Sequence, residues 1–291
     1  MLYPKKNCLC RIITSKDISE KILFQKKQSD EEQSFFRQYS VNTSNDPEEG
    51  KTLLHYLFPY KKISLQVEEH GAFAGCFTFN YDSLNQFRLY GKANKEEGTG
   101  ISIAFNKNFF NMKSIVLPTK KSTEELSIFR CIYIDTETDT IVSLGHKEES
   151  VFLRENKKVN YQEYIDDINR ILKDVKKELK ELKELVRNWE SKNLDYNVIC
   201  KLLLPLRYMI KNAAFKEEQE CRIIQTKKIT DPNVSEDENN RFYVDYYKLS
   251  PKNVAKIVFG PKAKDIDKFR QCLARNRYNG IECYQSKVPL A

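Results

Sequence analysis

The chain has 291 residues, of which 40% are hydrophobic and 12% aromatic. Such a length and composition allow a substantial buried core, in one large domain or in a domain with an insertion. No run of about 18 apolar residues occurs, so we predict no membrane-spanning helix. The start, MLYPKKNCLCRII, lacks the apolar region of a secretory signal. We therefore expect a cytoplasmic protein, and delivery into a host cell as an effector stays open.

Eight cysteines and three histidines occur, and no histidine lies near a close cysteine pair. Zinc-ligand spacing is therefore absent, and we expect no metal. Scattered cysteines favour buried free thiols in a reducing cytosol. The net charge of +8 would suit an acidic partner or a nucleic acid, but lysines interleave with acids along the chain. Because no nucleic-acid motif is present, we do not expect binding to nucleic acid.

The predicted elements begin with a strand at residues 8–13 and a helix at 16–24. Residues 45–50, NDPEEG, form a sharp turn by composition, because Asn and Asp bond to their own backbone and Pro fixes its φ angle. This turn is typical of the start of a helix, and an apolar helix is predicted to follow it. Further strands are predicted at 114–118, 128–134 and 141–144.

The pattern of residues 75–105 predicts a strand, a short helix, a glycine-rich loop and a second strand. In the last strand, alternate apolar residues predict one face on a core. Asp82, Arg88 and Tyr90 lie between the strands, beside glycines that let backbone approach a ligand. The layout indicates a ligand pocket or, equally, an ordinary buried turn.

From 161 to 189 the apolar residues recur three and four apart, with Lys and Glu between them. This heptad pattern predicts one long helix, since no glycine or proline interrupts it. Its partner is either the segment 196–210, folded back as a helical hairpin, or the same helix in a second molecule. The hairpin is favoured, and a coiled-coil homodimer stays open.

After the helical segment the strand pattern resumes, with strands predicted at 221–225, 242–247, 254–259 and 280–284 and a helix at 265–276. The predicted fold class is α+β, with mixed, mostly antiparallel sheets and a long helical hairpin as an insertion. Residues 1–153 and 214–291 would form one discontinuous body, and 154–213 the insertion.

Several segments in order resemble a bacterial family known only as a domain of unknown function, number 2971. They are NDPEEG, CFTFNYDSLNQFRLYG, GTGISIAF, FKEEQECRII, KIVFGP and YQSKVPLA. Phe87 stands where the family commonly has a tryptophan, which keeps an aromatic side chain there. The helical insertion lies outside the shared pattern, and the family name carries no activity.

Within FKEEQECRII, strand alternation would place Glu218, Glu220 and Arg222 on one face. This pattern looks like the Glu-x-Glu arrangement of ADP-ribosyltransferases, in which nicotinamide leaves NAD and a ribosyl oxocarbenium ion develops. The resemblance implies an ADP-ribosyltransferase-like split sandwich with NAD as substrate. Glu220 would be the catalytic residue that stabilises the cation, and Glu218 would orient the acceptor. On residue pattern alone, Glu220 and Arg222 could equally form a surface ion pair.

The same resemblance implies a phosphate contact from Arg11 on the first strand, with Arg37 as the alternative. Arg offers a planar, permanently charged fork for such a contact. Ser40 would match the superfamily's central serine. Arg88 and Tyr90 of the pocket-like stretch would complete the NAD site.

Three functions follow as hypotheses. The first is an NAD-consuming enzyme that transfers ADP-ribose to a protein or other acceptor, or hydrolyses NAD, in a bacterial effector, toxin or phage-defence setting. The second is a non-catalytic interaction or sensor module that dimerises or recruits a partner through the 161–189 helix. The third is nucleic-acid binding or cleavage, and only the positive net charge of the chain suggests it.

Overall fold

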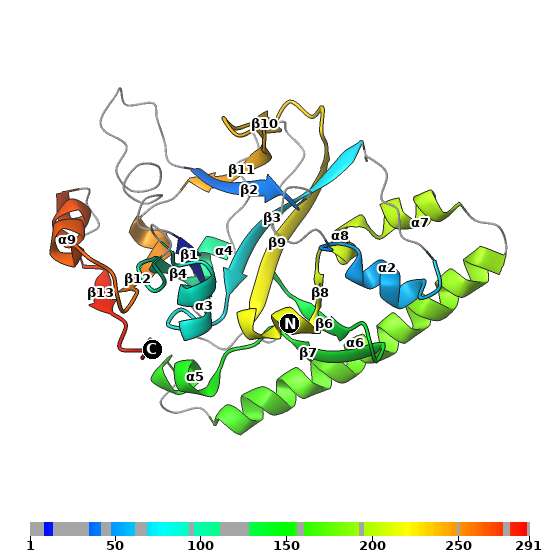
Figure 1. Cartoon of the computed structure of the whole chain (residues 1–291), viewed down its shortest axis with the longest axis horizontal. Coiled ribbons are helices and arrows are strands. Elements are labelled where there is room, and N and C mark those ends of the chain that lie inside the picture. The colour runs from blue at the N-terminus through cyan, green and yellow to red at the C-terminus, as the bar shows by residue number, and fades with distance from the viewer. Residues whose placement is uncertain are drawn as a thin grey trace.

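Figure 1 shows the computed structural model of the whole chain. The structure describes residues 9–13, 35–41, 48–61, 69–92, 96–110, 128–155, 160–191, 195–248, 251–275 and 280–289. The helix predicted at 16–24, the strand predicted at 114–118 and the first half of the NDPEEG turn lie outside these ranges.

The predicted α+β class is confirmed by two sheets, which are mostly antiparallel. Ten strands form the larger sheet, in which β9 pairs with β3 and β5 beside the path β10-β11-β2-β3-β1-β4-β12-β13. Its strands are β1 (Leu9–Ile13), β2 (Phe35–Ser40), β3 (His70–Thr78), β4 (Ile101–Phe105), β5 (Ile128–Arg130), β9 (Glu220–Lys228), β10 (Ser235–Glu236), β11 (Phe242–Lys248), β12 (Val254–Phe259) and β13 (Glu282–Gln285). The ADP-ribosyltransferase-like arrangement of these strands stays a prediction.

The smaller sheet has three strands in the order β7-β6-β8. Its strands are β6 (Ile132–Asp135), β7 (Thr140–Leu144) and β8 (Ile210–Asn212). The α-helices are α2 (Thr52–Leu57), α3 (Leu84–Leu89), α4 (Lys107–Phe110), α5 (Glu149–Glu155), α6 (Tyr161–Ser191), α7 (Tyr196–Leu202), α8 (Leu204–Arg207) and α9 (Ile266–Arg275). Two 3-10 helices, η3 (Ala213–Glu218) and η4 (Pro251–Asn253), precede β9 and β12.

The long antiparallel pair β3–β9 lies at the centre of the larger sheet (Figure 1). Its register runs from His70 opposite Lys228 to Thr78 opposite Glu220. Directly opposed residues share a face of the sheet. Phe77 and Cys221 therefore lie together on one face, in a hydrophobic cluster with residues of β4 and β12. On the other face of β3, Cys76 and Thr78 stand opposite the charged residues Arg222 and Glu220 of β9.

β4 is buried on both faces, whereas the sequence predicted a core on one face only. It lies between β1 and β12 in the sheet. Ile101, Ile103 and Phe105 join the cluster of Phe77, and Ala104 joins a second cluster with Tyr81. A small alanine thus allows α3 and α5 to pack against the face that alternation assigned to solvent.

The run predicted as one strand at 128–134 divides at Cys131 into β5 and β6, which belong to different sheets. The backbone N–H of Cys131 donates to the carbonyl oxygen of Glu220 at 3.0 Å, and that of Ile132 donates to Met209 at 2.9 Å. The chain therefore passes from the larger sheet to the smaller one within a single residue.

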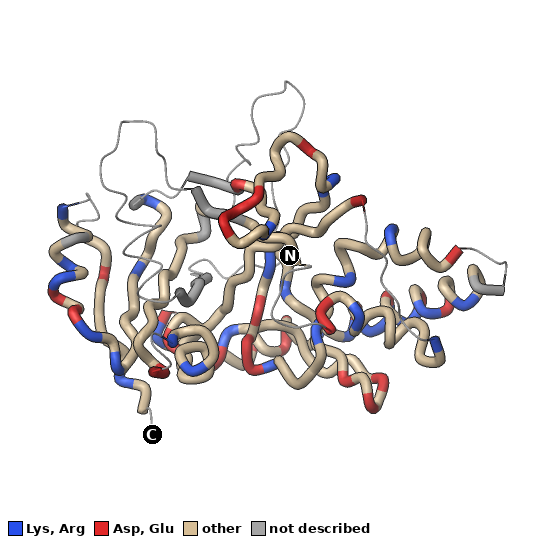
Figure 2. Tube along the Cα trace, turned by 45° about the horizontal axis from the view of Figure 1, so that its top comes forward, with Lys and Arg blue, Asp and Glu red and all other residues tan. Residues whose placement is uncertain are grey.

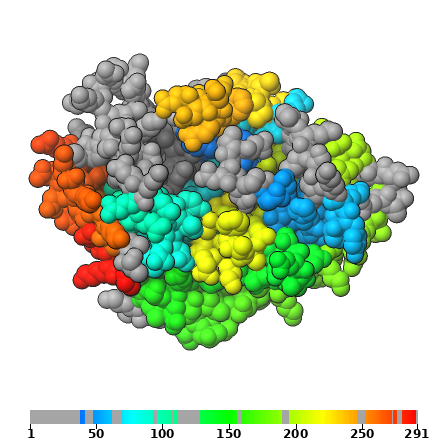
Figure 3. All heavy atoms as spheres, in the orientation of Figure 1, coloured from blue at the N-terminus to red at the C-terminus, as the bar shows by residue number. Residues whose placement is uncertain are grey.

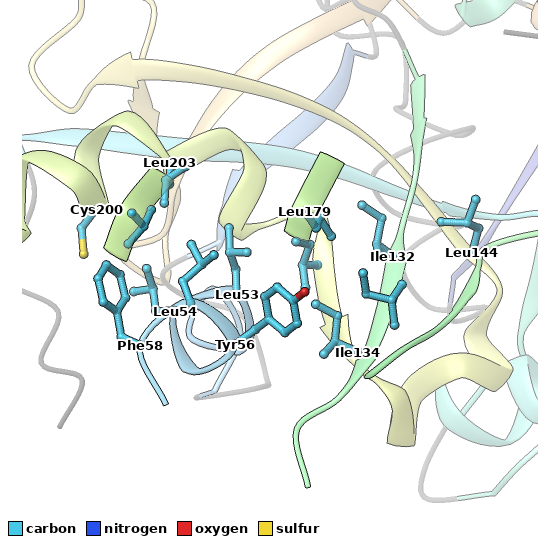
Figure 4. Close-up of a cluster of buried hydrophobic side chains, with 14 of the residues drawn as sticks. Leu53, Leu54, Tyr56, Phe58, Ile132, Ile134, Leu144, Leu179, Cys200 and Leu203 are labelled. Carbon is cyan, nitrogen blue, oxygen red and sulfur yellow. The ribbon is translucent and has the colours of Figure 1, made fainter. Parts of the chain in front are cut away.

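The long predicted helix is confirmed as α6, and its apolar seam packs against the rest of the same chain. Figure 4 shows Leu179 of α6 among side chains of α2 and β6. Ile168 and Val186 are buried in the same cluster. The returning arm is shorter than predicted, because α7 and α8 are separated near Pro205 and the chain enters β8 at Ile210. The division into a body and an insertion stays a prediction.

None of the described helices combines the length and the apolar character that a membrane crossing requires.

Truncation of the α6 seam should destabilise the protein. Leu179 is 4% exposed, whereas Leu185 on the same helix is 49% exposed. We expect Leu179→Ala to lower the free energy of unfolding by about 2–5 kcal/mol, because it leaves a cavity. We expect Leu185→Ala to lower it by about 0.5 kcal/mol. Urea denaturation of both variants measures the difference, and equal losses would contradict the packing of α6.

Candidate functional site

A tight bend at the start of β9 brings two carboxylates together. η3 ends at Glu218, Gln219 adopts the left-handed conformation with φ of 47°, and β9 begins at Glu220. The prediction that Glu218 and Glu220 lie on one strand is therefore wrong, since Glu218 belongs to η3. The bend nevertheless turns both side chains toward Lys211 of β8.

Five ionisable side chains form a connected charge cluster, which consists of Glu49, Lys211, Glu218, Glu220 and Arg222. Lys211 Nζ lies 2.7 Å from Glu220 Oε2 and also donates to Glu218. Arg222 binds Glu220 with two donors, Nε to Oε1 at 2.7 Å and Nη2 to Oε2 at 3.0 Å. The second partner of Arg222 is Glu49, which lies just before α2.

The charge cluster is buried, so the surface ion pair that the sequence left open is wrong. Its side chains are between 3% and 8% exposed. A buried carboxylate loses its hydration, and only close cations and hydrogen bonds can offset that cost. Removing one partner leaves the others charged and unpaired, so the members of the cluster depend on one another.

Contacts from β6 and from Cys131 just before it fix the backbone of Glu220. The N–H of Glu220 donates to the Tyr133 hydroxyl at 2.8 Å, and its carbonyl accepts from Cys131. Gly145 lies so close that an added Cβ would sit 2.1 Å from the Glu220 carbonyl oxygen. Only glycine fits there, because a contact with backbone cannot be relieved by a side-chain rotation.

The carbonyl of Glu218 is held from the other side of the bend. Thr78 Oγ1 donates to it at 2.8 Å and Gln86 Nε2 at 2.7 Å. Gln219 in turn accepts from the backbone N–H of His146 at 2.8 Å. These contacts tie the bend to β3, α3 and the segment after β7, so it is positioned by three separate elements.

Electrostatics keep Glu220 ionised. Burial on its own would raise the pKa of Glu220, but attraction to Arg222 and Lys211 outweighs it and holds the pKa well below the ordinary value. For Lys211, burial would lower the pKa, but the attraction of Glu220 raises it well above the ordinary value. The pair is therefore charged throughout the physiological pH range.

Three side chains join the charge cluster to solvent. Tyr90, 43% exposed, donates its hydroxyl to Glu218 Oε1 at 2.5 Å. Phe215, 37% exposed, lies with its ring centroid 5.3 Å from Lys211 Nζ. α3, which ends just before Tyr90, and η3, which contains Phe215, contact each other and adjoin on the surface in Figure 3.

The third is Cys76, a free cysteine that is exposed although β3 is an interior strand. It stands opposite Arg222 in the β3–β9 register. Its close surroundings raise the pKa of the thiol to about 12, first through desolvation and then through the negative charge of Glu220. Cys76 is thus exposed as a residue, whereas its sulfur is desolvated in a position beside Glu220 and Arg222.

The structure brings together some of the predicted site residues. Glu218, Glu220 and Tyr90 meet at the charge cluster. Arg88 lies apart, 3.7 Å from Glu97. Asp82 binds Arg154 at 2.9 Å and serves to hold α5.

The three predicted residues on the first strands pair elsewhere. Ser40 is buried and stands opposite Phe73 in the register of β2 and β3. Arg11 of β1 stands opposite Ile103, and Arg37 of β2 stands opposite Asp245. The side chains of both arginines lie outside the described part of the structure, so the phosphate contact stays a prediction.

Sequence reasoning missed Glu49, Lys211, Tyr133 and Gly145. Glu49 belongs to NDPEEG, which was interpreted as a turn that caps a helix. That turn does precede α2, and it also delivers a carboxylate to Arg222. Lys211 has no local pattern that could have identified it, because its role comes from the return of β8 to β6.

The family model described as "Protein of unknown function (DUF2971)" matches residues 86–223. The predicted resemblance to DUF2971 is confirmed. The DUF2971 match begins in α3 and ends in β9, so it includes Tyr90, Lys211 and the two carboxylates. It also spans the helical segment that the sequence pattern placed outside the resemblance. Comparison with curated proteins and with solved structures gives no match.

Within the ranges that the structure describes, no group of three or more His, Cys, Asp or Glu side chains could hold a metal ion. The carboxylates of the charge cluster are instead neutralised by Lys211 and Arg222.

The charge cluster predicts how stability depends on pH. The pKa of Glu220 is lower in the folded state than its ordinary value of 4.5. The stabilisation by ionised Glu220 is therefore complete above that value and is lost as the pH falls toward the folded pKa. We expect Glu220→Gln to lower the free energy of unfolding by about 3–5 kcal/mol at pH 7, because Lys211 and Arg222 lose a partner. Urea denaturation between pH 7 and pH 3 should show this gap narrowing in acid, and a gap that widens would contradict the assignment.

The thiol of Cys76 provides a second test. Because its pKa is raised to about 12, its alkylation rate should rise about tenfold per pH unit from pH 8 to pH 10 without a plateau. An ordinary thiol would level off near its pKa of about 8.5. Iodoacetamide labelling followed by peptide mass spectrometry measures the rate at Cys76 alone. A plateau near pH 9 would show that Cys76 does not lie beside Glu220.

Proposed function

We propose that the protein is an NAD-consuming enzyme that transfers ADP-ribose to a protein or other acceptor, or to water. The observation that carries this proposal is the pair of buried carboxylates, Glu218 and Glu220, held together by Lys211 beside Cys76 and the exposed residue Tyr90. Fixed carboxylates in a site of low dielectric suit a reaction in which positive charge develops.

The reaction would break the bond between ribose C1′ and the nicotinamide nitrogen. The bonding electrons leave with nicotinamide, which becomes neutral, and positive charge develops on the ribose as an oxocarbenium ion. A lone pair of the acceptor then forms the new bond to C1′, and the acceptor proton passes to a carboxylate or to water. Carboxylates stabilise such a cation in glycoside chemistry.

Glu220 is the residue that we assign to the ribose. Its Oε2 accepts from both Lys211 and Arg222, whereas Oε1 accepts from Arg222 Nε. A carboxylate oxygen can accept two hydrogen bonds. The Cys76 thiol makes a side-chain hydrogen bond with Glu220, so a ribose hydroxyl would bind this carboxylate in place of that thiol.

Glu218 is the residue that we assign to the acceptor, because its carboxylate reaches Tyr90 at the surface. Arg11 or Arg37 would contact phosphate, and Tyr90 would be a further NAD-binding residue, whereas Ser40 and Arg88 lie away from these carboxylates. The acceptor is a further partner of the proposed reaction, in a bacterial effector, toxin or phage-defence setting.

The alternative function, recruitment of a partner or dimerisation through α6, draws less support from the packing. The residues of its apolar seam are buried or partly buried against α2, the smaller sheet and α7. A second molecule would have to displace part of this core to use the same residues.

NAD turnover in matched variants tests the enzyme proposal. We expect Glu220→Gln to reduce the rate of nicotinamide release by at least about 100-fold, because one interaction made only in the transition state is worth that much in related sites. Glu217→Gln is the control, since Glu217 is exposed and adjacent in sequence. High-performance liquid chromatography of nicotinamide measures both rates.

Thermal melting of each variant separates lost chemistry from lost folding. Glu218→Gln provides a second variant if Glu220→Gln unfolds. Turnover in folded Glu220→Gln at the native rate, or no NAD binding by the native chain, would overturn the proposal.

A further inference from the structure

The basic charge of the chain is concentrated near its C-terminal end. Residues 251–291 hold nine Lys or Arg and three Asp or Glu, so this segment carries +6 of the net charge of +8. The other 250 residues are close to neutral as a group. An uneven distribution of this kind indicates a surface for a negatively charged partner.

The fold places this segment at one end of the larger sheet, as β12, α9 and β13 (Figure 2). α9 buries Leu273 and packs Ile266 and Phe269 against the core of that sheet. Lys268, Gln271 and Arg275 are exposed and lie three and four residues apart. That spacing puts them on one face of the helix, away from the apolar side.

The turn between β12 and α9 carries further basic residues just before the helix begins. Lys262 and Lys264 are both exposed there. We call Lys262, Lys264, Lys268 and Arg275 the basic face. Lys264 forms an exposed ion pair with Glu96 at 3.1 Å, which solvent weakens. No ion pair with another described residue is found for Lys262, Lys268 or Arg275.

Against the expectation drawn from the interleaved charges of the whole chain, we propose that the basic face binds the phosphate backbone of double-stranded nucleic acid. α9 has ten residues, so it extends about 15 Å and reaches several successive phosphates. Lysine and arginine side chains on such a surface bind phosphates without reading the sequence. This inference uses a surface separate from the charge cluster and does not rest on the proposed NAD chemistry.

Two other negatively charged partners fit less well. Among the described residues, every large hydrophobic side chain that is exposed lies outside 251–275 and 280–289, so an apolar anchor for a membrane surface is missing from these ranges. Phe269 and Tyr284 are partly buried in hydrophobic clusters. They are therefore not available as the stacking platforms that single strands require.

Fluorescence anisotropy with a labelled DNA duplex of about 20 base pairs tests the proposal at about 50 and 200 mM salt. The test variant combines Lys262→Glu, Lys268→Glu and Arg275→Glu. The control combines Lys173→Glu, Lys176→Glu and Lys180→Glu, which reverses three exposed lysines on α6 and changes the net charge equally. We expect the test variant to bind at least about 10-fold more weakly at low salt and the control to stay within about 3-fold.

The native chain should also bind less tightly at the higher salt, because bound phosphates release counterions. Equal weakening in both variants would overturn the proposal, since net charge alone would then explain binding. Absence of duplex binding by the native chain at low salt would overturn it as well. Tighter binding to the single strand, or to phosphatidylserine vesicles, would assign the basic face to another partner and contradict it.

Discussion

The double contact between Arg222 and Glu220, completed by Lys211, is the interaction on which the candidate site depends. Burying these ions removes their hydration, and the close donors to both carboxylate oxygens offset that cost. Comparable buried ion networks can often be replaced by apolar residues with little loss of stability. Stability alone therefore does not account for five ionisable side chains at this position, and a fixed negative charge here is what the proposed reaction would use.

The fold serves this interaction by returning distant segments to one place. Glu49 arrives before α2, Lys211 arrives on β8 after the long helix, and Glu218 and Glu220 arrive at the bend before β9. α6 packs across α2 and the smaller sheet, so it holds two of these three segments in position. In this way a helix far from the carboxylates contributes to their geometry.

Local patterns predicted most of the elements that the structure describes. The alternation in 101–105 predicted β4, and the three-four spacing in 161–189 predicted α6. Both follow from periodicity, which a single segment contains in full. The resemblance to DUF2971 also directed attention to the segment with Glu218 and Glu220, whose two carboxylates the structure does bring together.

The partners of these carboxylates could not be predicted, because they depend on pairing between segments distant in sequence. Lys211 reaches the site through the parallel pairing of β8 with β6. The bend at Gln219 is left-handed, although neither glycine nor asparagine, the residues that favour this conformation, occupies the position. The same dependence on distant segments explains why the sequence alone left open a surface ion pair between Glu220 and Arg222. Alternation shows which residues share a face, but burial of that face depends on Tyr208 and Glu49 from other elements.

Protection of Cys76 by NAD would test the central claim most directly, since it reports occupancy beside Glu220 without requiring turnover. Peptide mass spectrometry after iodoacetamide treatment would compare Cys76 with Cys283, a partly buried free thiol in β13. The account predicts that millimolar NAD slows the modification of Cys76 several-fold and leaves Cys283 unchanged. Unchanged labelling of Cys76 at every NAD concentration would contradict it.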